Sequence, residues 1–367
     1  MASDDDLQLR LPSLPKEHTM KGFQVTLDDI AKKVKVSKVT VSKALRGHPD
    51  ISAETAKKIE LVAQNLGYYP NFMARNLSSM KSNTIGVIVP KIAHFFFSSV
   101  IEAIYDAAFE NNYEIILTVS QENSERELRH IRSLLSMRVD GLIVSLSEQT
   151  RDYSIFQEAR KRGVPLVFMD RVPGLDGFNT VVADDCAGAF SATEQAINIG
   201  YRKLAHLAGY KHTNIGRERC RGFEMALKRY GVHTNREWIV YGGFGEEDGY
   251  KGFMTLYESG RLPEFILAVT FPVALGVYRA VEELGMRIPN DIDIISFGNS
   301  GFNRFLAPPM SYVDQPTREL GRKALELTLE NIRKKDQFVP QHIKLPTNLV
   351  LCKTCIKKGT AARRRTR

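Results

Sequence analysis

The spacing of hydrophobic residues changes once along the chain. From Thr26 to about Ser79, apolar positions recur at helical spacing and no β-rich run interrupts them. The polar stretch 78–84 that follows predicts a linker. Beyond it, short apolar runs alternate with longer amphipathic segments up to about Leu351. The pattern therefore predicts a small helical domain followed by a larger α/β body.

The larger region contains short apolar runs that predict strands, most of them separated by amphipathic stretches that predict helices. The predicted strands are 85–89, 114–119, 141–145, 165–169, 180–183, 204–208, 238–241, 265–269 and 292–297, and the predicted helices are 97–111, 124–137, 187–199, 218–230 and 274–284. Such alternation is typical of parallel, doubly wound sheets. The length suits two sheets, with a ligand cleft at the carboxyl ends of the strands, although one long sheet also fits the pattern.

The helical region predicts a helix-turn-helix. Thr26 is a suitable N-cap for a first helix whose apolar face comprises positions 27, 30, 31 and 34. After a turn at 35–37, Ser37 caps a second helix over 38–45, and the second helix of this motif places its N-terminal side chains in the major groove of DNA. A third helix from Ser52 to Gly67 completes a small core with positions 59, 61, 62 and 66. A generic three-helix bundle is the alternative interpretation.

Charge is unevenly distributed along the 367 residues. The formal net charge is +9; residues 21–82 hold eleven basic and five acidic side chains, and residues 352–367 hold seven basic and no acidic ones. The body between them is nearly neutral. This segregation favours a head that binds nucleic acid on a body that binds something else.

The composition excludes several classes of protein. With 43% hydrophobic and 25% charged residues the chain is an ordinary globular protein, and no run approaches the roughly 20 apolar residues of a membrane span. The N-terminus lacks the pattern of a signal peptide, so a cytoplasmic location is expected. Cys352 and Cys355 are spaced like half of a zinc site or a redox pair, but no further ligands accompany them. No cofactor, metal or catalytic motif is expected, so the chain is not expected to be an enzyme.

Two motifs, VSKVTVSKAL at 36–45 and YYPNFMARNL at 68–77, closely resemble the DNA-binding head and hinge of the LacI/GalR transcriptional regulators. The resemblance continues through the body to about Leu351. It implies a hinge helix that folds on DNA and pairs with its dimer partner, and a two-lobed body like that of periplasmic binding proteins. The expected domains are a disordered extension at 1–22, the head at 23–69, the hinge and linker at 70–82, an effector-binding and dimerisation body at 83–351 and a basic tail at 352–367.

The resemblance implies a DNA contact for each residue that matches a contact position of the family. Lys38, Val39 and Lys43 match base-reading positions, because a lysine can donate to guanine and a valine can contact a thymine methyl. Thr40 and Ser42 are expected to hold phosphates, and Leu77 matches an apolar wedge in the minor groove. The expected DNA-binding set is Ser37, Lys38, Val39, Thr40, Ser42, Lys43, Asn71, Ala74 and Leu77.

The resemblance also implies a ligand site in the body. Arg219 matches an arginine that meets ligand hydroxyls or carboxylates, and Phe244 matches an aromatic residue that stacks on the ligand ring. The chain is expected to cross between the lobes near residues 183, 309 and 339. The expected effector-binding set is Phe95, Phe96, Arg171, Asp184, Arg219, Phe244 and Asn299.

The chain departs from the family pattern at four residues. Lys35 stands where many members have glycine in the turn, at a cost of roughly 1 kcal/mol if its backbone is left-handed. Thr270 and Phe271 replace a common Asn-Asp pair, and Gly298 stands where an aspartate commonly accepts sugar hydroxyls. Either Asn299 substitutes for that aspartate, or the ligand is more apolar or more anionic than a free sugar. Loss of acids beside two arginines favours a phosphorylated or carboxylated effector.

The sequence therefore predicts a homodimeric transcriptional regulator, expected to be a repressor, that binds a palindromic DNA operator. Its expected effector is a small metabolite such as a sugar or sugar phosphate, and no membrane partner is expected. A regulator that has lost small-molecule sensing, and is constitutive or controlled by a protein partner, is a second interpretation. A solute-binding protein is a third, but such a protein would have no use for the head.

Overall fold

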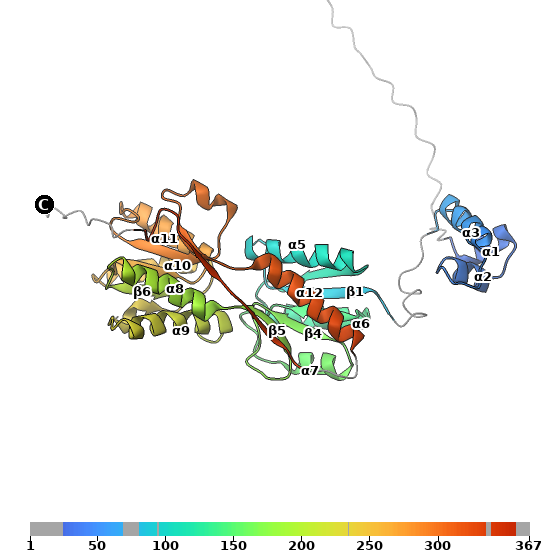
Figure 1. Cartoon of the computed structure of the whole chain (residues 1–367), viewed down its shortest axis with the longest axis horizontal. Helices are drawn as coiled ribbons and strands as arrows, with labels where there is room; N and C mark the ends of the chain where they lie inside the picture. Colours follow the sequence, from blue (N-terminus) through green and yellow to red (C-terminus); the bar gives the residue numbers. More distant parts are fainter. Residues whose placement is uncertain (1–24, 69–80, 94, 234, 335–338, 357–367) are drawn as a thin grey trace, which may run out of the picture. The chain divides into compact units, whose positions relative to one another are not determined.

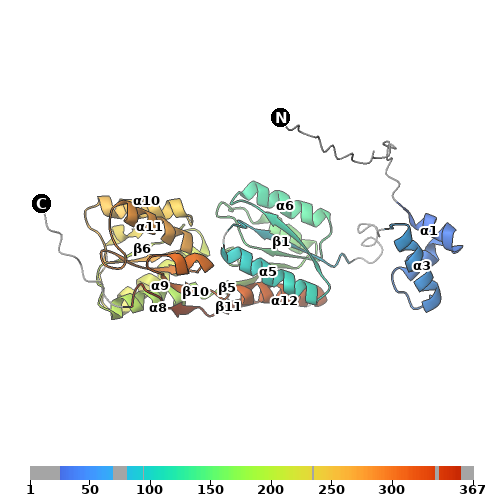
Figure 2. The ribbon, with the colours of Figure 1, turned by 90° about the horizontal axis from the view of Figure 1, so that it is seen from above.

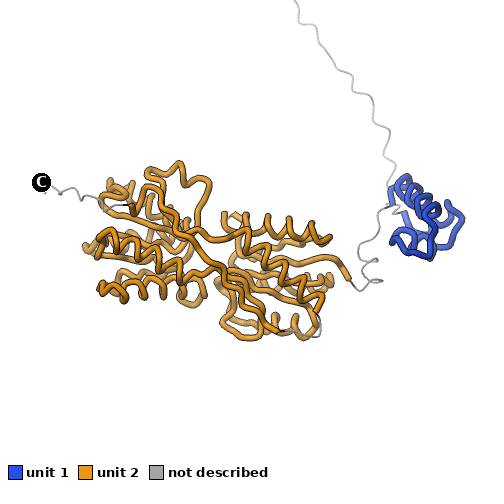
Figure 3. The backbone as a smooth tube through the Cα atoms, in the orientation of Figure 1, with its two compact units in different colours: residues 1–80 blue, residues 81–367 orange. Residues whose placement is uncertain are grey.

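The chain forms two compact units, residues 1–80 and 81–367 (Figure 3). The structure, a computed structural model, describes residues 25–68, 81–93, 95–233, 235–334 and 339–356. The predicted hinge helix, with Asn71, Ala74 and Leu77, lies outside these residues, as do the predicted N-terminal extension and most of the basic tail.

The head consists of three helices, as predicted: α1 (Leu27–Val34), α2 (Lys38–Ala44) and α3 (Ala53–Asn65). Thr26, Ser37 and Ser52 are their N-caps, and each side chain accepts a hydrogen bond from a backbone N–H in the first turn. The fully buried side chains of Ile30, Val41 and Ile59 form the centre of the core. The prediction that position 61 is buried is wrong, because Leu61 lies two residues after Ile59 on the opposite side of α3 and is 59% exposed.

Lys35 ends α1 in the left-handed conformation, with φ 61° and ψ 44°. Its N–H donates to the carbonyl of Ala31, which closes the last turn of the helix. The turn of the helix-turn-helix therefore keeps the geometry that glycine would adopt. Because Lys35 has a side chain, its backbone is strained in this conformation.

The first lobe of the body is a parallel six-stranded sheet in the order β11-β5-β4-β3-β1-β2. Helices α5 (Phe95–Glu110) and α12 (Thr317–Arg333) cover one face, and α6 (Ser124–Ser136) covers the other (Figure 2). Helix α7 (Ser154–Lys161) packs on the same side as α6. Its strands are β1 (Thr84–Val89), β2 (Glu114–Val119), β3 (Gly141–Val144), β4 (Leu166–Met169), β5 (Asn179–Ala183) and β11 (His342–Leu345).

The second lobe, which contains the strand labelled β6 in Figure 1, repeats this architecture. Its strand order is β12-β10-β9-β8-β6-β7, and within this sheet only the edge pair β10 and β12 is antiparallel. Helices α8 (Asp185–Asn198) and α9 (Asn214–Arg229) cover one face, and α10 (Glu246–Glu258) and α11 (Phe271–Glu283) cover the other. Its strands are β6 (Leu204–Leu207), β7 (Ile239–Val240), β8 (Phe265–Ala268), β9 (Asp293–Phe297), β10 (Ser311–Asp314) and β12 (Asn348–Val350), with 3₁₀ turns at Arg236–Trp238 and Gly301–Phe305. The prediction of two doubly wound sheets is confirmed.

Two of the three predicted crossings between the lobes are misplaced. The first does follow Ala183, where β5 leads into α8. The second lies between β10 and α12, beyond Asp314 rather than near 309, and the third lies between β11 and β12, beyond Leu345 rather than near 339. The cause is that β10, β11 and β12 are too short and too polar to stand out as strands in the sequence.

The body also continues past the predicted boundary at Leu351. Thr354 and Cys355 are fully buried, and the N–H of Cys355 donates to the Asp293 carboxylate at 3.0 Å. The assignment of these residues to a solvated tail is therefore wrong. All four cysteines are free thiols.

Candidate functional site

The exposed surface of α2 presents the predicted DNA-binding residues of the head. The Ser37 hydroxyl accepts a hydrogen bond from the N–H of Thr40 at 3.0 Å and lies 2.8 Å from the Thr40 hydroxyl. Val39, at the start of the helix, is 63% exposed and has no place in the core. An exposed apolar side chain at this position suits contact with a base methyl group.

Both lysines of this surface are paired with acids of the head. The ammonium group of Lys38 lies 2.9 Å from the Asp28 carboxylate, and that of Lys43 lies 2.9 Å from the Asp50 carboxylate. The hydrogen bond from Lys43, helped by His48, lowers the pKa of Asp50. These pairs are exposed and therefore weak, so either lysine can exchange its partner for a phosphate or a base.

A cavity of about 60 Å³ lies between the two lobes of the body. Its walls are loops and helix starts that follow the carboxyl ends of β1 and β4 in the first lobe and of β6, β7, β8 and β9 in the second. A neighbouring hollow of about 320 Å³ shares Phe95, Phe96, Asn299 and Gln315 with it. The cleft predicted at the strand ends is therefore present.

The predicted effector residues that line this cavity are Phe95, Phe96, Arg171, Arg219, Phe244 and Asn299. Asp184 is the exception, and its prediction as a cavity residue is wrong. Its carboxylate caps α8 by accepting a hydrogen bond from the N–H of Ala187 at 3.1 Å, so it faces the helix start.

Arg219 extends from α9 to the wall of the cavity, where it forms a buried ion pair with Asp185. Its Nε and Nη2 lie 2.9 and 2.8 Å from one oxygen of Asp185, and its Nη1 donates to the carbonyl of Val269. The guanidinium carbon lies 4.1 Å from the centre of the Phe297 ring. Burial raises the pKa of Asp185 more than Arg219 lowers it, so the pair carries a desolvation cost.

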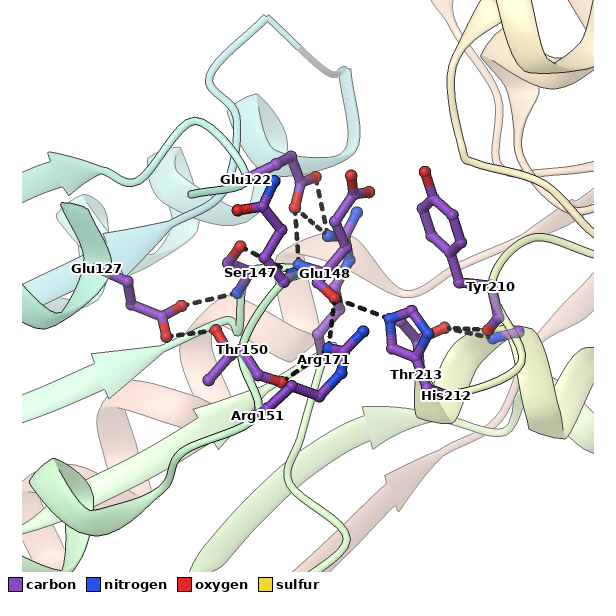
Figure 4. Close-up of polar contacts among 12 residues, drawn as sticks. Glu122, Glu127, Ser147, Glu148, Thr150, Arg151, Arg171, Tyr210, His212 and Thr213 are labelled. Carbon is purple, nitrogen blue, oxygen red and sulfur yellow. Dashed lines mark hydrogen bonds and ion pairs between the residues drawn. The ribbon is translucent and has the colours of Figure 1, made fainter. Parts of the chain in front are cut away.

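Arg171 is held in the same manner in the first lobe (Figure 4). Its Nη1 donates to both carboxylate oxygens of Glu122, at 2.8 and 2.7 Å, and both side chains are buried. Across the cleft, the guanidinium carbon lies 4.9 Å from the ring centre of Phe244. Its Nε–H is buried without a partner among the described residues.

Asp170 is a cavity residue that the sequence analysis did not predict. It lies immediately after β4 with a left-handed backbone, φ 60°, and is 7% exposed. No side chain or N–H in the described part of the chain donates a hydrogen bond to its carboxylate, and burial raises its pKa to about 7. Its place at the carboxyl end of a predicted strand, beside Arg171, was the signal that could have identified it.

A further buried acid lies behind Arg171 (Figure 4). Glu127 accepts hydrogen bonds from the N–H of Ser147 and the hydroxyl of Thr150, both at 2.7 Å. Burial nevertheless raises its pKa, as it does for Glu148, whose N–H donates to Glu122. Three glutamates thus lie near Arg171, and Arg151 donates to the carbonyls of Glu148 and Thr150 beside them (Figure 4).

Direct hydrogen bonds join the two lobes at one end of the cavity. The Asn214 amide donates to the carbonyl of Asp170 at 2.8 Å and accepts from the N–H of Val172 at 3.1 Å. His212 contacts the Glu148 carbonyl through Nε2 at 2.7 Å (Figure 4). The loop that carries Asp170 and Arg171 is thus bound to the start of α9 in the other lobe.

Residues 26–71 match the model of the bacterial regulatory proteins of the lacI family, and residues 82–355 match the model of the periplasmic binding proteins and sugar binding domain of the LacI family. The chain belongs to the LacI family. It is 31% identical over 314 residues to catabolite control protein A of Priestia megaterium, covering 85% of this chain and 94% of that protein. It is 32% identical to the transcriptional repressor PurR of Pasteurella multocida, covering 85% of this chain and 93% of that protein.

A solved structure of the lac repressor dimer, bound to operator and the anti-inducer ONPF, matches the fold with a TM-score of 0.80 at 26% identity. The match covers 90% of this chain and 99% of that chain. The LacI-family relatives are DNA-binding regulators of transcription, so this chain is a transcriptional regulator and not an enzyme. None of the described helices is long and apolar enough to cross a membrane.

Proposed function

We propose that the chain is a cytoplasmic, homodimeric repressor that reads a two-fold symmetric DNA operator and binds a small effector in the cavity between its lobes. The observation that carries this proposal is the pairing of a capped helix-turn-helix head with a cavity lined from both lobes. The lac repressor neighbour, described as a dimer bound to operator and an anti-inducer, supports both parts.

In this proposal α2 enters the major groove. Lys38, Val39 and Lys43 read base edges, and Ser37, Thr40 and Ser42 hold the backbone in register. Lys38 and Lys43 leave Asp28 and Asp50 when they meet DNA, an exchange of one exposed partner for another.

The hinge residues Asn71, Ala74 and Leu77 belong to the same proposal. Leu77 wedges between base steps in the minor groove, where unstacking costs roughly a few kcal/mol and the bent DNA gains further contacts. Two hinges related by the dimer axis would place this kink at the centre of the operator.

The effector site comprises Phe95, Phe96, Arg171, Arg219, Phe244 and Asn299, with Asp170 added from the geometry. A ligand there touches both lobes at once, and it changes DNA binding only if it prefers one arrangement of the lobes over another. A regulator without small-molecule sensing would not require a cavity with buried charged groups on its walls, so sensing is the function that the site favours.

The test is a selection of duplexes from a randomised DNA library by the full chain, followed by affinity measurements at several salt concentrations. Two inverted half-sites should be enriched, and affinity should fall steeply with salt because phosphate contacts release counterions. Lys38→Ala should relax preference at one symmetric pair of positions by roughly 1–3 kcal/mol. Lys57→Ala, which removes an exposed lysine of α3, is the matched control.

Enrichment of sequences without two-fold symmetry would contradict the dimeric operator. An equal loss of affinity for all sequences in Lys38→Ala would make Lys38 a phosphate contact rather than a base-reading residue.

A further inference from the structure

Two adjacent acids stand at the start of α1, and only one of them caps the helix. The Asp29 carboxylate completes the cap, because it accepts hydrogen bonds from the N–H and the hydroxyl of Thr26 at 2.9 and 2.7 Å. Asp28 takes no part in this cap. In the described part of the chain its carboxylate has one partner, the ammonium group of Lys38 at 2.9 Å.

The contact with Lys38 places Asp28 on the surface that meets DNA in the proposed function. Lys38 is the first residue of α2, and the N-terminal end of this helix is the end that enters the major groove. Both side chains are more than half exposed, at 58% for Lys38 and 54% for Asp28. The other pair, Lys43 with Asp50, lies toward the opposite end of α2, and its acid also contacts His48 at 3.3 Å. Asp28 is therefore the acid beside the base-reading lysine at the groove end of the helix.

DNA binding separates Asp28 from its partner. When Lys38 donates to a guanine, the Asp28 carboxylate loses the cation beside it and lies among phosphates of its own charge. A carboxylate in that place is unfavourable unless the DNA itself donates a hydrogen bond to it. In the major groove the donors are the amino groups of cytosine, N4, and of adenine, N6.

The edge of a G·C base pair matches this ion pair in spacing and in polarity. Guanine O6 accepts, cytosine N4 donates, and a Watson–Crick hydrogen bond joins the two atoms, so they lie about 2.9 Å apart. The ammonium group of Lys38 and the carboxylate of Asp28 also lie 2.9 Å apart, donor beside acceptor. Lys38 can therefore donate to O6, and to the neighbouring N7, while Asp28 accepts from N4 of the paired cytosine.

The three other base pairs fit less well. At a T·A pair the ammonium group meets O4 and the methyl group of thymine, and the carboxylate lies beside adenine N7, which is also an acceptor. At C·G and A·T pairs, where the two bases are exchanged, Lys38 faces an amino group and Asp28 faces an oxygen. Donor then meets donor and acceptor meets acceptor, which is a penalty that a lysine alone does not impose.

We propose that Asp28 is a specificity-determining residue that reads, together with Lys38, one G·C base pair in each half of the operator. The guanine lies at Lys38 and the cytosine lies at Asp28. This inference rests on the proposed function, in which α2 enters the major groove with Lys38 toward the base edges.

The experiment repeats the DNA selection on the full chain with the parent, Asp28→Ala, Lys38→Ala and Glu60→Ala. Glu60 is an exposed acid of α3, so its variant is the matched control for the loss of one negative charge. Affinities are then measured by fluorescence anisotropy for four duplexes that differ only in the base pair that depends on Lys38, changed in both half-sites. Far-UV circular dichroism compares the folding of the variants.

The parent should select G·C at the position that Lys38→Ala relaxes, and it should prefer the G·C duplex to the C·G duplex by about a hundredfold, because both half-sites are changed. Asp28→Ala should lower this ratio by about tenfold, mainly by tighter binding of the C·G duplex. Glu60→Ala should leave the ratio unchanged.

A parent that selects another base pair at this position would overturn the inference. So would an unchanged ratio in Asp28→Ala, or a gain in affinity that is equal for all four duplexes, because Asp28 would then act by its charge alone. These results would leave Lys38 as a base-reading residue. If Lys38→Ala relaxed no position, the role of Lys38 in the proposed function would fail together with the inference.

Discussion

Asp170 makes a prediction about stability that can be worked out from its surroundings. Burial raises the pKa of its carboxyl from 3.8 to about 7, against the opposing effect of Arg171. Below pH 3.8 the carboxyl group is protonated in both the folded and the unfolded chain, so its titration does not change the free energy of unfolding there. Between pH 3.8 and about 7 the unfolded chain releases a proton that the folded chain keeps, so folding becomes less favourable as the pH rises.

The size of the effect follows from the difference in pKa. A pKa that is higher by about three in the folded state corresponds to about 4 kcal/mol, because each pKa unit is worth about 1.36 kcal/mol. Asparagine has nearly the same shape and cannot ionise. The difference in unfolding free energy between Asp170→Asn and the parent should therefore increase by up to about 4 kcal/mol between pH 4 and pH 8.

A second contribution to the difference in unfolding free energy does not depend on pH, and it destabilises the variant. The asparagine amide gains no new partner in the cavity, and an unsatisfied buried polar group costs about 1–3 kcal/mol at any pH. The variant should thus be similar to or less stable than the parent near pH 4 and more stable near pH 8. Only the change with pH, and not the offset, reports the Asp170 carboxyl.

The assay is urea denaturation of the full chain at pH 4.5, 6, 7 and 8, followed by far-UV circular dichroism. Other buried acids, such as Asp293 with its pKa raised to about 6, contribute equally to both proteins and cancel in the comparison. Asp176→Asn, which changes an exposed acid in the same loop, should show no pH-dependent difference. A flat difference for Asp170→Asn, or a loss of stability that grows with pH, would mean that the carboxylate is well paired, and it would refute the reasoning.

Two further predictions concern the buried arginine and the hinge. Arg219→Leu leaves the Asp185 carboxylate buried without its partner and should lower the unfolding free energy by about 3–5 kcal/mol in urea denaturation, whereas adding Asp185→Ala should restore at least half of the loss. A double variant as unstable as the single one would contradict this account of the pair. Leu77→Ala should weaken operator binding by about tenfold or more in fluorescence anisotropy, because an apolar wedge offsets the cost of unstacking, while sedimentation still shows a dimer. Unchanged specific affinity would exclude the wedge.

Most of the helices and strands could be predicted from local features of the sequence. Thr26, Ser37 and Ser52 mark helix starts because a side-chain oxygen that caps a helix acts within three residues. The strands of the sheet centres are continuous apolar runs because both of their faces are covered by helices. These features depend on neighbours along the chain, so the pattern of residues reveals them.

The missed elements depend on contacts that are distant in sequence. The edge strand β11 has the alternating sequence HIKL and is defined by its pairing with β5, about 160 residues earlier. Helix α12 has a narrow apolar stripe in a polar sequence, and its partner α5 lies about 210 residues before it. Short polar strands at an edge carry little periodic signal.

The same limit applies to the charges of the cavity. The sequence pattern correctly placed Arg171 just after a strand and Arg219 within a helix, although α9 begins at Asn214 and not at 218. It could not pair Arg171 with Glu122 or Arg219 with Asp185. Both arginines appeared to be free cations, which led to the expectation of an anionic ligand. Asp184 and Asp185 are adjacent in sequence, yet one caps a helix and the other neutralises Arg219.

The position of Asp170 indicates how ligand binding and lobe closure are connected. Its side chain lines the cavity, while its carbonyl and the N–H of Val172 are bound by the Asn214 amide of the other lobe. A ligand that donates to the carboxyl therefore acts on the loop that joins the lobes. It also stabilises the ionised form of a carboxyl group, which burial makes unfavourable. Such a ligand would bind more tightly to an arrangement of the lobes that buries Asp170 than to one that exposes it, and a difference in affinity of this kind is what a sensor requires.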